Sequence, residues 1–457
     1  MSIWSALNSA YSFEDAFRAK DCTSQAMRAA VKEWFRLYYQ QEPTEESDPC
    51  QRIAYTVVNK LTKTAFGEYD AKSDDEFAQS VLHVLDAVKK KAMQAALIGG
   101  EAWLKPVPGR DGFTFSVVSR DNVLIFGRDS QGVQTDVGAA EYSVNGRNFY
   151  TLLERRTVDR RGYLTIRNML YCSEMPETLG RQVPLAELEQ YEDLPEEYTF
   201  REPLGGLGMA RMITPMENCV DGSKDGVSIY APAVGLIHNI DRNEALLNGE
   251  FERGQSRIIV SDDLLRKDRT GRRRLEDKIF VGGFDENPED MKPIIFSPEL
   301  REKSFLARKQ EYLRDVESII GLKRGLLSEV EAEERTATEI TSSAGDYNLT
   351  IIDFQSMFED AVREAVRLCG VLGRLYRVPG AHDVNPDKVS IDWGDGVLYN
   401  RDKVNQEMLS QVQSGLLAPE RYLGWYYEQP ANTPEERARI RKDYMPELKG
   451  LAAEDDL

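Results

Sequence analysis

Residues 229–254 read IYAPAVGLIHNIDRNEALLNGEFERG and form the first of three helical patterns that decide the fold of this chain. Pro232 suits the first turn of a helix, because it has no backbone N–H that would remain unpaired there. Gly254 suits the position just after the helix, where glycine is favoured. Between these limits, apolar side chains recur at helical spacing. They are Val234, Ile237, Ile240, Leu247 and Phe251.

Two further helical patterns follow a charged segment. The second begins at Ser297-Pro298-Glu299, which combine an N-cap residue, a first-turn proline and a first-turn acid. It ends at Gly321, and four apolar residues are expected on one face: Leu306, Leu313, Val316 and Ile320. The third begins at Thr336, which has capping-box spacing to Glu339, and ends before Pro379. Its apolar residues are Ile340, Tyr347, Ile351, Phe354, Phe358, Val362, Ala365, Leu368 and Leu372.

The third pattern predicts one helix of about 40 residues, which would be roughly 60 Å long. Such a helix is too long for the core of one ordinary domain. We therefore expect it to span a large assembly in which neighbouring subunits cover part of its apolar face. Gly345 is expected to introduce a kink.

Three short motifs accompany these helices: Gly226–Tyr230 with Ile240-Asp241, Arg335–Ile340, and Trp393-Gly394-Asp395. With them, the order of parts over nearly the whole chain resembles the portal proteins of tailed bacteriophages, of the siphophage type. The motifs are structural rather than catalytic. The resemblance implies an α+β, α-rich portal fold and a ring of subunits, commonly twelve, at one capsid vertex through which DNA passes.

The resemblance also divides the chain into the parts of a portal subunit. It implies a wing over 1–228, stem helices over 229–254 and 297–321, a clip over 255–296, a tunnel loop over 322–335, the long helix and a returning wing strand over 336–400, and a crown with a C-terminal tail over 401–457. Within the wing, helical patterns precede a β-rich pattern. The helices are expected at about 24–38, 53–66 and 74–97, and the strands at 113–118, 123–126, 149–157 and 163–170.

Composition narrows the functional classes. The chain has 457 residues and a formal net charge of −19, with a sequence pI near 4.9. This balance disfavours a sequence-specific DNA binder, whose surface is usually basic. It suits a conduit whose acidic wall repels phosphate, although many soluble proteins are equally acidic.

The five cysteines are scattered and never in CxxC spacing, which predicts reduced thiols and a cytosolic folding environment. The first residues lack the pattern of a signal peptide, and no apolar stretch is long enough to span a bilayer. We therefore expect a protein that assembles in a cytosol and has no membrane partner. The resemblance to portal proteins implies that this is the host cytoplasm and that the protein becomes part of the virion.

One basic cluster interrupts this acidic chain, inside the expected clip. It has two interpretations: a contact with DNA phosphate, the packaging motor or an acidic adaptor, or a solvated hairpin tip, which is the usual place for a run of charge. Strands are expected on either side, at 257–260 and 278–281. The cluster consists of Arg266, Lys267, Arg269, Arg272, Arg273 and Arg274.

The expected tunnel loop would line the channel. Its acidic residues outnumber its basic ones, and phosphate affinity grows with each cation that pairs with the DNA backbone. Such a loop should bind DNA weakly and let the duplex slide in both directions. Its charged residues are Lys323, Arg324, Glu329, Glu331, Glu333, Glu334 and Arg335.

No motif for catalysis, a metal or a cofactor is evident. The histidines His83, His238 and His382 share no local pattern. The glycine-rich stretches at Gly99-Gly100 and at Pro203–Gly208 both lack the lysine of a phosphate-binding loop. The prediction is a non-enzymatic portal subunit whose partners are copies of itself, double-stranded DNA bound without sequence specificity, terminase, head-completion or tail adaptor proteins, and the capsid and scaffolding proteins. The alternatives are a capsid or tail protein without a DNA channel, and an intracellular enzyme with an unrecognised carboxylate site.

Overall fold

The computed structural model describes residues 9–39, 49–176, 178–254, 257–261, 280–283, 294–296, 299–329, 337–394, 401–427, 429–431 and 433–445. For 9–12, 257–261, 280–283, 294–296, 337–346, 401–404 and 407, this description covers the backbone only. The chain forms two compact units, Met1–Trp393 and Gly394–Leu457. The mixture of helices and antiparallel sheets confirms the predicted α+β class.

Four helices begin the first unit: α1 (Ser9–Phe17), α2 (Gln25–Tyr39), α3 (Ile53–Ala65) and α4 (Glu76–Gly99). The last three were predicted, and α1 was not. Asp75 caps α4 by accepting a hydrogen bond from the Ala78 N–H at 2.9 Å. Trp34, Phe35 and Tyr38 are buried, so these aromatic residues pack in the core.

Two antiparallel sheets follow the helices. The first has the strand order β10 (Ala210–Ile213), β2 (Glu101–Pro108), β3 (Phe113–Ser119). The second has the order β4 (Val123–Arg128), β5 (Gln134–Asn145), β6 (Asn148–Val158), β7 (Leu164–Ser173), β8 (Arg181–Val183), with β9 (Glu197–Thr199) also pairing with β7. The sequence did not predict β5, whose centre holds small residues with little preference for strands. Trp103 and Val118 of the first sheet share a buried cluster with Val123 and Val137 of the second.

The last strand of the first unit pairs with its first strand. Strand β14 (Ser390–Asp392) pairs with β1 (Asp70–Lys72), which confirms the strand predicted after Pro379. Trp393 then packs against the rings of Phe66, Tyr69 and Phe358 at centroid distances of 4.9 to 6.2 Å. Single 3-10 turns lie at Arg120–Asn122, Leu185–Glu187, Glu189–Tyr191, Ala231–Ala233 and Pro386–Lys388.

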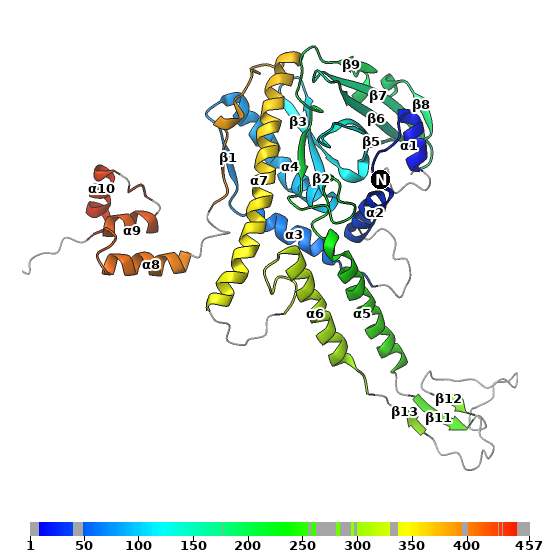
Figure 1. Cartoon of the computed structure of the whole chain (residues 1–457), viewed down its shortest axis with the longest axis vertical. Coiled ribbons are helices and arrows are strands. Elements are labelled where there is room, and N and C mark those ends of the chain that lie inside the picture. Colours follow the sequence, from blue (N-terminus) through cyan, green and yellow to red (C-terminus); the bar gives the residue numbers. More distant parts are fainter. Residues whose placement is uncertain are drawn as a thin grey trace, which may run out of the picture. The chain divides into compact units, whose positions relative to one another are not determined.

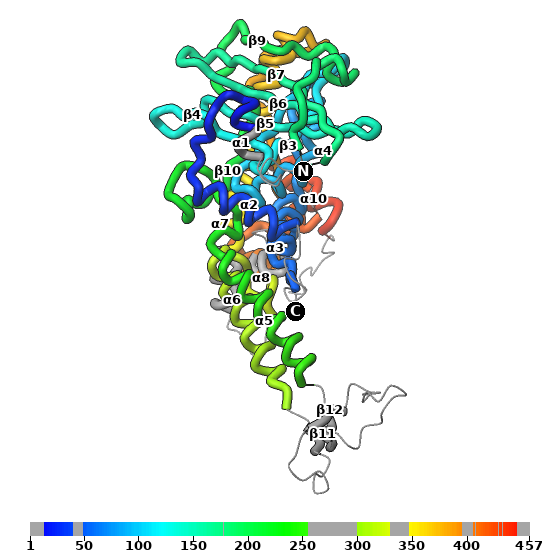
Figure 2. The backbone as a smooth tube through the Cα atoms, turned by 90° about the vertical axis from the view of Figure 1, so that its right-hand side faces the viewer, coloured from blue at the N-terminus to red at the C-terminus, as the bar shows by residue number. Residues whose placement is uncertain are grey.

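Helices α5 (Val234–Arg253) and α6 (Glu302–Ile320) lie side by side in both backbone views (Figures 1 and 2). Two ion pairs run in opposite order along the helix pair, so the two helices are antiparallel: Glu244 lies 2.8 Å from Lys309, and Glu250 lies 2.7 Å from Arg301. Asn243 Nδ2 also donates to the Phe305 carbonyl at 3.0 Å. The segment between the helices contains a small sheet of the order β12 (Phe280–Gly283), β11 (Arg257–Ser261), β13 (Ile294–Phe296).

Several details of this helix pair differ from the sequence prediction. Pro232 lies in the 3-10 turn before α5. Helix α6 begins at Glu302, after an Arg301 N-cap that makes no side-chain capping bond, so the predicted start at Ser297-Pro298-Glu299 is wrong. Leu306 is exposed, whereas Leu313, Val316 and Ile320 are buried as expected. Gly321 ends α6 in the left-handed conformation at φ 75°, as glycine allows.

Helix α7 (Ala337–Tyr376) has the predicted length of 40 residues and is continuous through Gly345. Its apolar face packs on α3, α4, β2 and β10 of the same chain. The expectation that neighbouring subunits cover this face is therefore wrong for the apolar residues that the chain buries itself, whereas Leu349 of the same helix is 61% exposed. The buried residues are Tyr347, Ile351, Phe354, Phe358, Val362, Ala365, Leu368 and Leu372.

The second unit contains α8 (Arg401–Gln413), α9 (Pro419–Tyr426) and α10 (Pro434–Tyr444). The sequence Thr433-Pro434-Glu435-Glu436 predicts a capping box at the start of α10, and this capping box is present. Thr433 Oγ1 accepts from the Glu436 N–H at 3.2 Å, and Glu436 Oε2 accepts from the Thr433 N–H at 2.9 Å. The rings of Tyr427 and Tyr444 stack at 4.3 Å and join α9 to the end of α10.

Candidate functional site

The segment Gly226–Tyr230 leads directly into α5 and is fixed to the body by its own polar groups. The Ile229 N–H and the Ser228 hydroxyl both donate to the Leu97 carbonyl, at 3.0 and 3.1 Å. The Tyr230 hydroxyl donates to the Trp34 carbonyl at 2.7 Å. All three side chains are buried. The motif that the sequence singled out is therefore the point at which α5 is anchored to α2 and α4.

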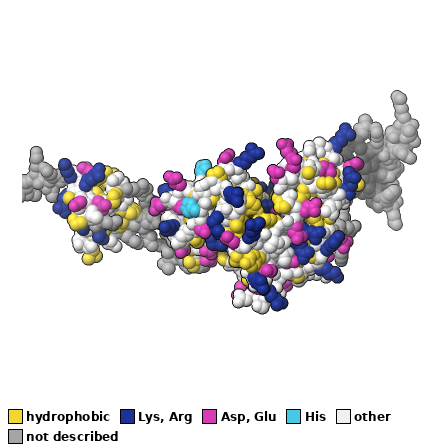
Figure 3. All heavy atoms as spheres, turned by 90° about the horizontal axis from the view of Figure 1, so that it is seen from above, with side chains coloured by type: hydrophobic (Ala, Val, Ile, Leu, Met, Phe, Trp, Pro, Cys, Tyr) yellow, Lys and Arg dark blue, Asp and Glu magenta, His cyan; other side chains and the backbone are white. Residues whose placement is uncertain are grey.

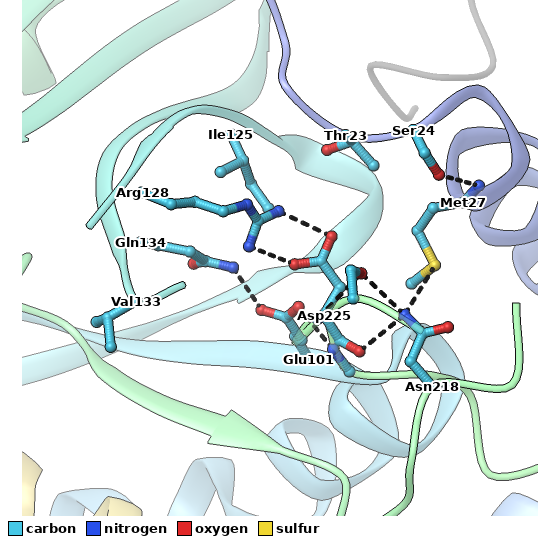
Figure 4. Close-up of polar contacts among 12 residues, drawn as sticks. Thr23, Ser24, Met27, Glu101, Ile125, Arg128, Val133, Gln134, Asn218 and Asp225 are labelled. Carbon is cyan, nitrogen blue, oxygen red and sulfur yellow. Dashed lines mark hydrogen bonds and ion pairs between the residues drawn. The ribbon is translucent and has the colours of Figure 1, made fainter. Parts of the chain in front are cut away.

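Glu101 is the centre of this anchor and is fully buried (Figure 4). Its carboxylate accepts from the Gly226 N–H at 2.9 Å, from Gln134 Nε2 at 2.9 Å and from Arg211 Nε at 3.0 Å. Burial raises the pKa of Glu101, but the positive charges of Arg211 and Arg120 outweigh burial and leave the pKa below its usual value. The side chain thus stays ionised and holds three segments together.

An ion pair between a buried acid and a half-buried base lies beside Glu101. Asp225, next to Gly226 in the chain, forms an ion pair of 2.6 Å with Arg128 of β4, as Figure 4 shows. The Asp225 carbonyl also accepts from Asn218 Nδ2 at 3.2 Å. These residues were not predictable from the sequence, because acids and bases far apart in the chain give no local pattern.

Gly100 and Gly226 must both be glycine because their backbones touch. A Cβ atom on Gly100 would lie 2.3 Å from the Gly226 carbonyl carbon, and one on Gly226 would lie 2.1 Å from the Gly100 carbonyl oxygen. Gly100 also adopts a φ of 80° at the end of α4. Gly100, which lies between α4 and β2, therefore serves this close approach.

His238 links α5 to α2. Its Nε2 lies 2.8 Å from Glu33 Oε1, and Glu33 also accepts two hydrogen bonds of 2.8 Å from Arg36. Burial raises the pKa of Glu33, but the hydrogen bonds from Arg36 and His238 lower it to about 2. The hydrogen bond to Glu33 raises the pKa of His238 above its usual value of 6.5. Arg36 opposes this shift, and Asp241 supports it.

This pair predicts a pH-dependent stability. Because the pKa of His238 is higher in the folded than in the unfolded chain, the protonated side chain stabilises the fold below pH 6.5. This stabilisation is lost as the pH rises through the pKa of His238 in the folded chain. We expect His238→Asn to lower the thermal unfolding midpoint at about pH 5.5 and to change it little at about pH 8.5. Thermal unfolding of both proteins across this range measures the difference. A difference in midpoint that stays constant with pH would show that protonation of His238 contributes nothing.

The expected tunnel loop is described as far as Glu329. Within this part, Lys323, Arg324 and Glu329 are exposed. The Glu329 N–H donates to Gln310 Oε1 at 2.8 Å, and the Leu326 carbonyl accepts a hydrogen bond from Lys60 of α3. The loop is thus attached to both α6 and α3. Glu331, Glu333, Glu334 and Arg335 lie outside the described residues, as does the whole basic cluster from Arg266 to Arg274.

Sequence reasoning missed another buried acid, Glu317 of α6. Leu313, Val316, Glu317 and Ile320 lie on one helical face, and all four are buried. The sequence signal that could have identified Glu317 is a carboxylate at an apolar position of the helical pattern. Such an acid needs hydrogen-bond partners in the fold.

The described part of the chain contains no cluster of three or more His, Cys, Asp or Glu side chains that could hold a metal ion. Over the same residues, no helix is long and apolar enough to cross a membrane. All five cysteines are free. His382 lies 2.6 Å from Asp75, the N-cap residue of α4.

The fold is thus an α+β body with an antiparallel helix pair, α5 and α6, and one 40-residue helix, α7. No protein-family model matches the chain, and no curated protein is similar to it in sequence. Among solved structures, it is similar to a chain of the "Neck of native GTA particle computed with C12 symmetry". The two are 11% identical, with a TM-score of 0.48 over 92% of this chain and 99% of that chain.

Proposed function

We propose that this chain is the portal subunit of a tailed bacteriophage or a related particle. Copies of it form a ring at one capsid vertex, and double-stranded DNA is packaged and ejected through the ring. The ring first binds the terminase motor and then the head-completion or tail proteins. It does no chemistry itself, so ATP hydrolysis belongs to the motor.

One observation carries this proposal: the antiparallel pair of α5 and α6, with a small sheet between them in the chain. These elements occupy the positions at which the sequence resemblance implies the two stem helices and the clip. The charged loop and the 40-residue α7 follow in the same order. Repeated around a ring, a stem of two helices per subunit would enclose a channel.

The surface of the helix pair supports assembly into a ring. Each helix of the pair has a side that the other helix does not cover. Five large apolar side chains in or next to the two helices are 40 to 48% exposed. Clustered exposed apolar residues mark contacts with other proteins. In a ring, the neighbouring subunits would cover them through a heterologous contact. The residues are Leu246, Phe251, Leu300, Leu306 and Ile319.

The charge distribution supports a conduit without sequence specificity. Acidic and basic side chains are interspersed on the face shown in Figure 3, and the whole chain carries a net charge of −19. Tight phosphate binding needs many paired cations, and it would slow a duplex that must slide. A mixed surface with an acidic excess suits weak contact with moving DNA.

Light scattering and negative-stain imaging of the purified chain test this proposal. We expect a species many times the 51.9 kDa mass of one chain, with a central hole in its images. A monomer at micromolar concentration under several salt conditions would contradict the ring. A closed assembly without a hole would favour a capsid or tail protein that makes no DNA channel.

The basic cluster of the expected clip leads to a separate prediction. Replacing Arg272, Arg273 and Arg274 with alanine should leave ring assembly intact and lower the yield of filled or tailed particles at least about tenfold. The reason is that neutralising three cations in every subunit removes many contacts to phosphate or to an acidic partner at once. Virion titres measure the effect. Unchanged titres would favour the interpretation of this cluster as a solvated hairpin tip.

A further inference from the structure

Glu317 places a carboxylate inside the packed face of α6. Glu317 is 1% exposed and lies on the same helical face as Val316 and Ile320. A buried carboxylate is strongly disfavoured unless opposite charges or hydrogen bonds compensate it. The described partners of the Glu317 carboxylate are hydrogen-bond donors.

Four such bonds reach Glu317, and all come from the loop after α6. Oε2 accepts from the Gly325 N–H at 3.2 Å and from the Ser328 hydroxyl at 2.7 Å. Oε1 accepts from the Ser328 N–H at 2.9 Å and from the Leu327 N–H. Backbone N–H groups that converge on one anion form an anion-binding nest. Here the anion is a side chain of the preceding helix, so the loop is folded around Glu317.

The remaining contacts define where this loop runs. Gly321 reverses the chain at the end of α6, and the Leu322 N–H returns to the Glu317 carbonyl at 2.7 Å. Eight residues after Gly321, the Glu329 N–H binds Gln310, which lies about two helical turns before Glu317. Residues 322–329 therefore run back along α6, and Glu317 lies at the middle of this path.

We propose that Glu317 is a positioning residue that sets the direction in which the chain leaves α6. By holding Gly325, Leu327 and Ser328, it keeps the exposed charges of Lys323 and Arg324 in one place on every subunit. This inference rests on the proposed function, in which these charges line the DNA channel. Loss of the anchor would let the charges of all subunits move toward the duplex and bind it.

Limited trypsin digestion tests the anchor directly, because trypsin cleaves after Lys323 and Arg324. Glu317→Gln keeps the size of the side chain but removes its charge and replaces one acceptor oxygen with a donor NH₂ group. The loop should then open locally, and cleavage at these two sites should become about tenfold faster. Asp315→Asn is the matched control, since it removes one charge from an exposed position of the same helix. The control should be cleaved like the parent.

A milder variant keeps the test decisive if Glu317→Gln fails to fold. Ser328→Ala removes only the hydroxyl donor to Oε2 and should accelerate cleavage by a smaller factor. Circular dichroism with unchanged helix content separates local opening of the loop from unfolding of α6. Cleavage at the parental rate in both variants would overturn the anchoring role of Glu317.

Packaging tests whether this anchor matters for DNA. Particles built with the Glu317→Gln chain should contain rings in normal numbers and about tenfold fewer full genomes, and Glu317→Asp should restore part of the packaging. Normal packaging despite faster cleavage would overturn the role of Glu317 in positioning charges for DNA. A parent chain that forms no ring would overturn the proposed function, whereas the trypsin comparison would still decide whether Glu317 holds the loop.

Discussion

Replacing both Leu246 and Leu306 with glutamate should convert the ring into monomers. The two residues lie on α5 and α6 and are 48% and 44% exposed in the single chain. In the proposed ring, the neighbouring subunit covers them. A carboxylate buried there without a partner costs several kcal/mol, and every contact of a closed ring carries the same defect. Sedimentation velocity at micromolar concentration measures the change.

The control for this prediction places the same charges at polar positions of the same helices. Asn239 and Ser304 are exposed, and their replacement with glutamate should leave the ring intact. The isolated Leu246→Glu, Leu306→Glu chain should keep the thermal stability of a monomeric parent, because both positions are already exposed to water. An intact ring in this variant would show that subunits meet through another surface.

Replacing Glu101 with alanine should lower the free energy of unfolding by about 3–5 kcal/mol, which is typical when one member of a buried ionic network is removed. The loss leaves Arg211 without its partner and removes the acceptor of the Gly226 N–H. The segment that anchors α5 would also be released. Chemical unfolding followed by circular dichroism measures the change.

Two further substitutions test the origin of this effect. Glu101→Gln retains one acceptor oxygen and should destabilise the fold less than alanine does. Glu197 is exposed on β9, and its replacement with alanine should change the free energy of unfolding by no more than about 0.5 kcal/mol. Equal effects of the Glu101 and Glu197 substitutions would mean that Glu101 contributes no more to the free energy of unfolding than an exposed glutamate does.

Much of the local structure of this protein was predictable from its sequence. Helix α7, the turn at Gly321 and the capping box at Thr433 all depend on contacts within a few residues. The start of α6 was mispredicted, although Ser297-Pro298-Glu299 has the residue types of a helix N-terminus. Such residue types permit a helix to begin without requiring it, and contacts outside the segment decide where it does.

The anchors were not predictable, because their partners are far apart in the chain. Glu101 meets Gly226, Asp225 meets Arg128, and Lys60 meets Leu326 only after the chain has folded. The coverage of α7 by its own chain is likewise a property of packing. The sequence by itself determined most of the helical segments, although not α1 or the start of α6, and the apolar faces of those helices, since both follow from local periodicity. Only the tertiary structure decided what those faces contact and where buried charges find their partners, because these depend on distances between segments that no local pattern contains.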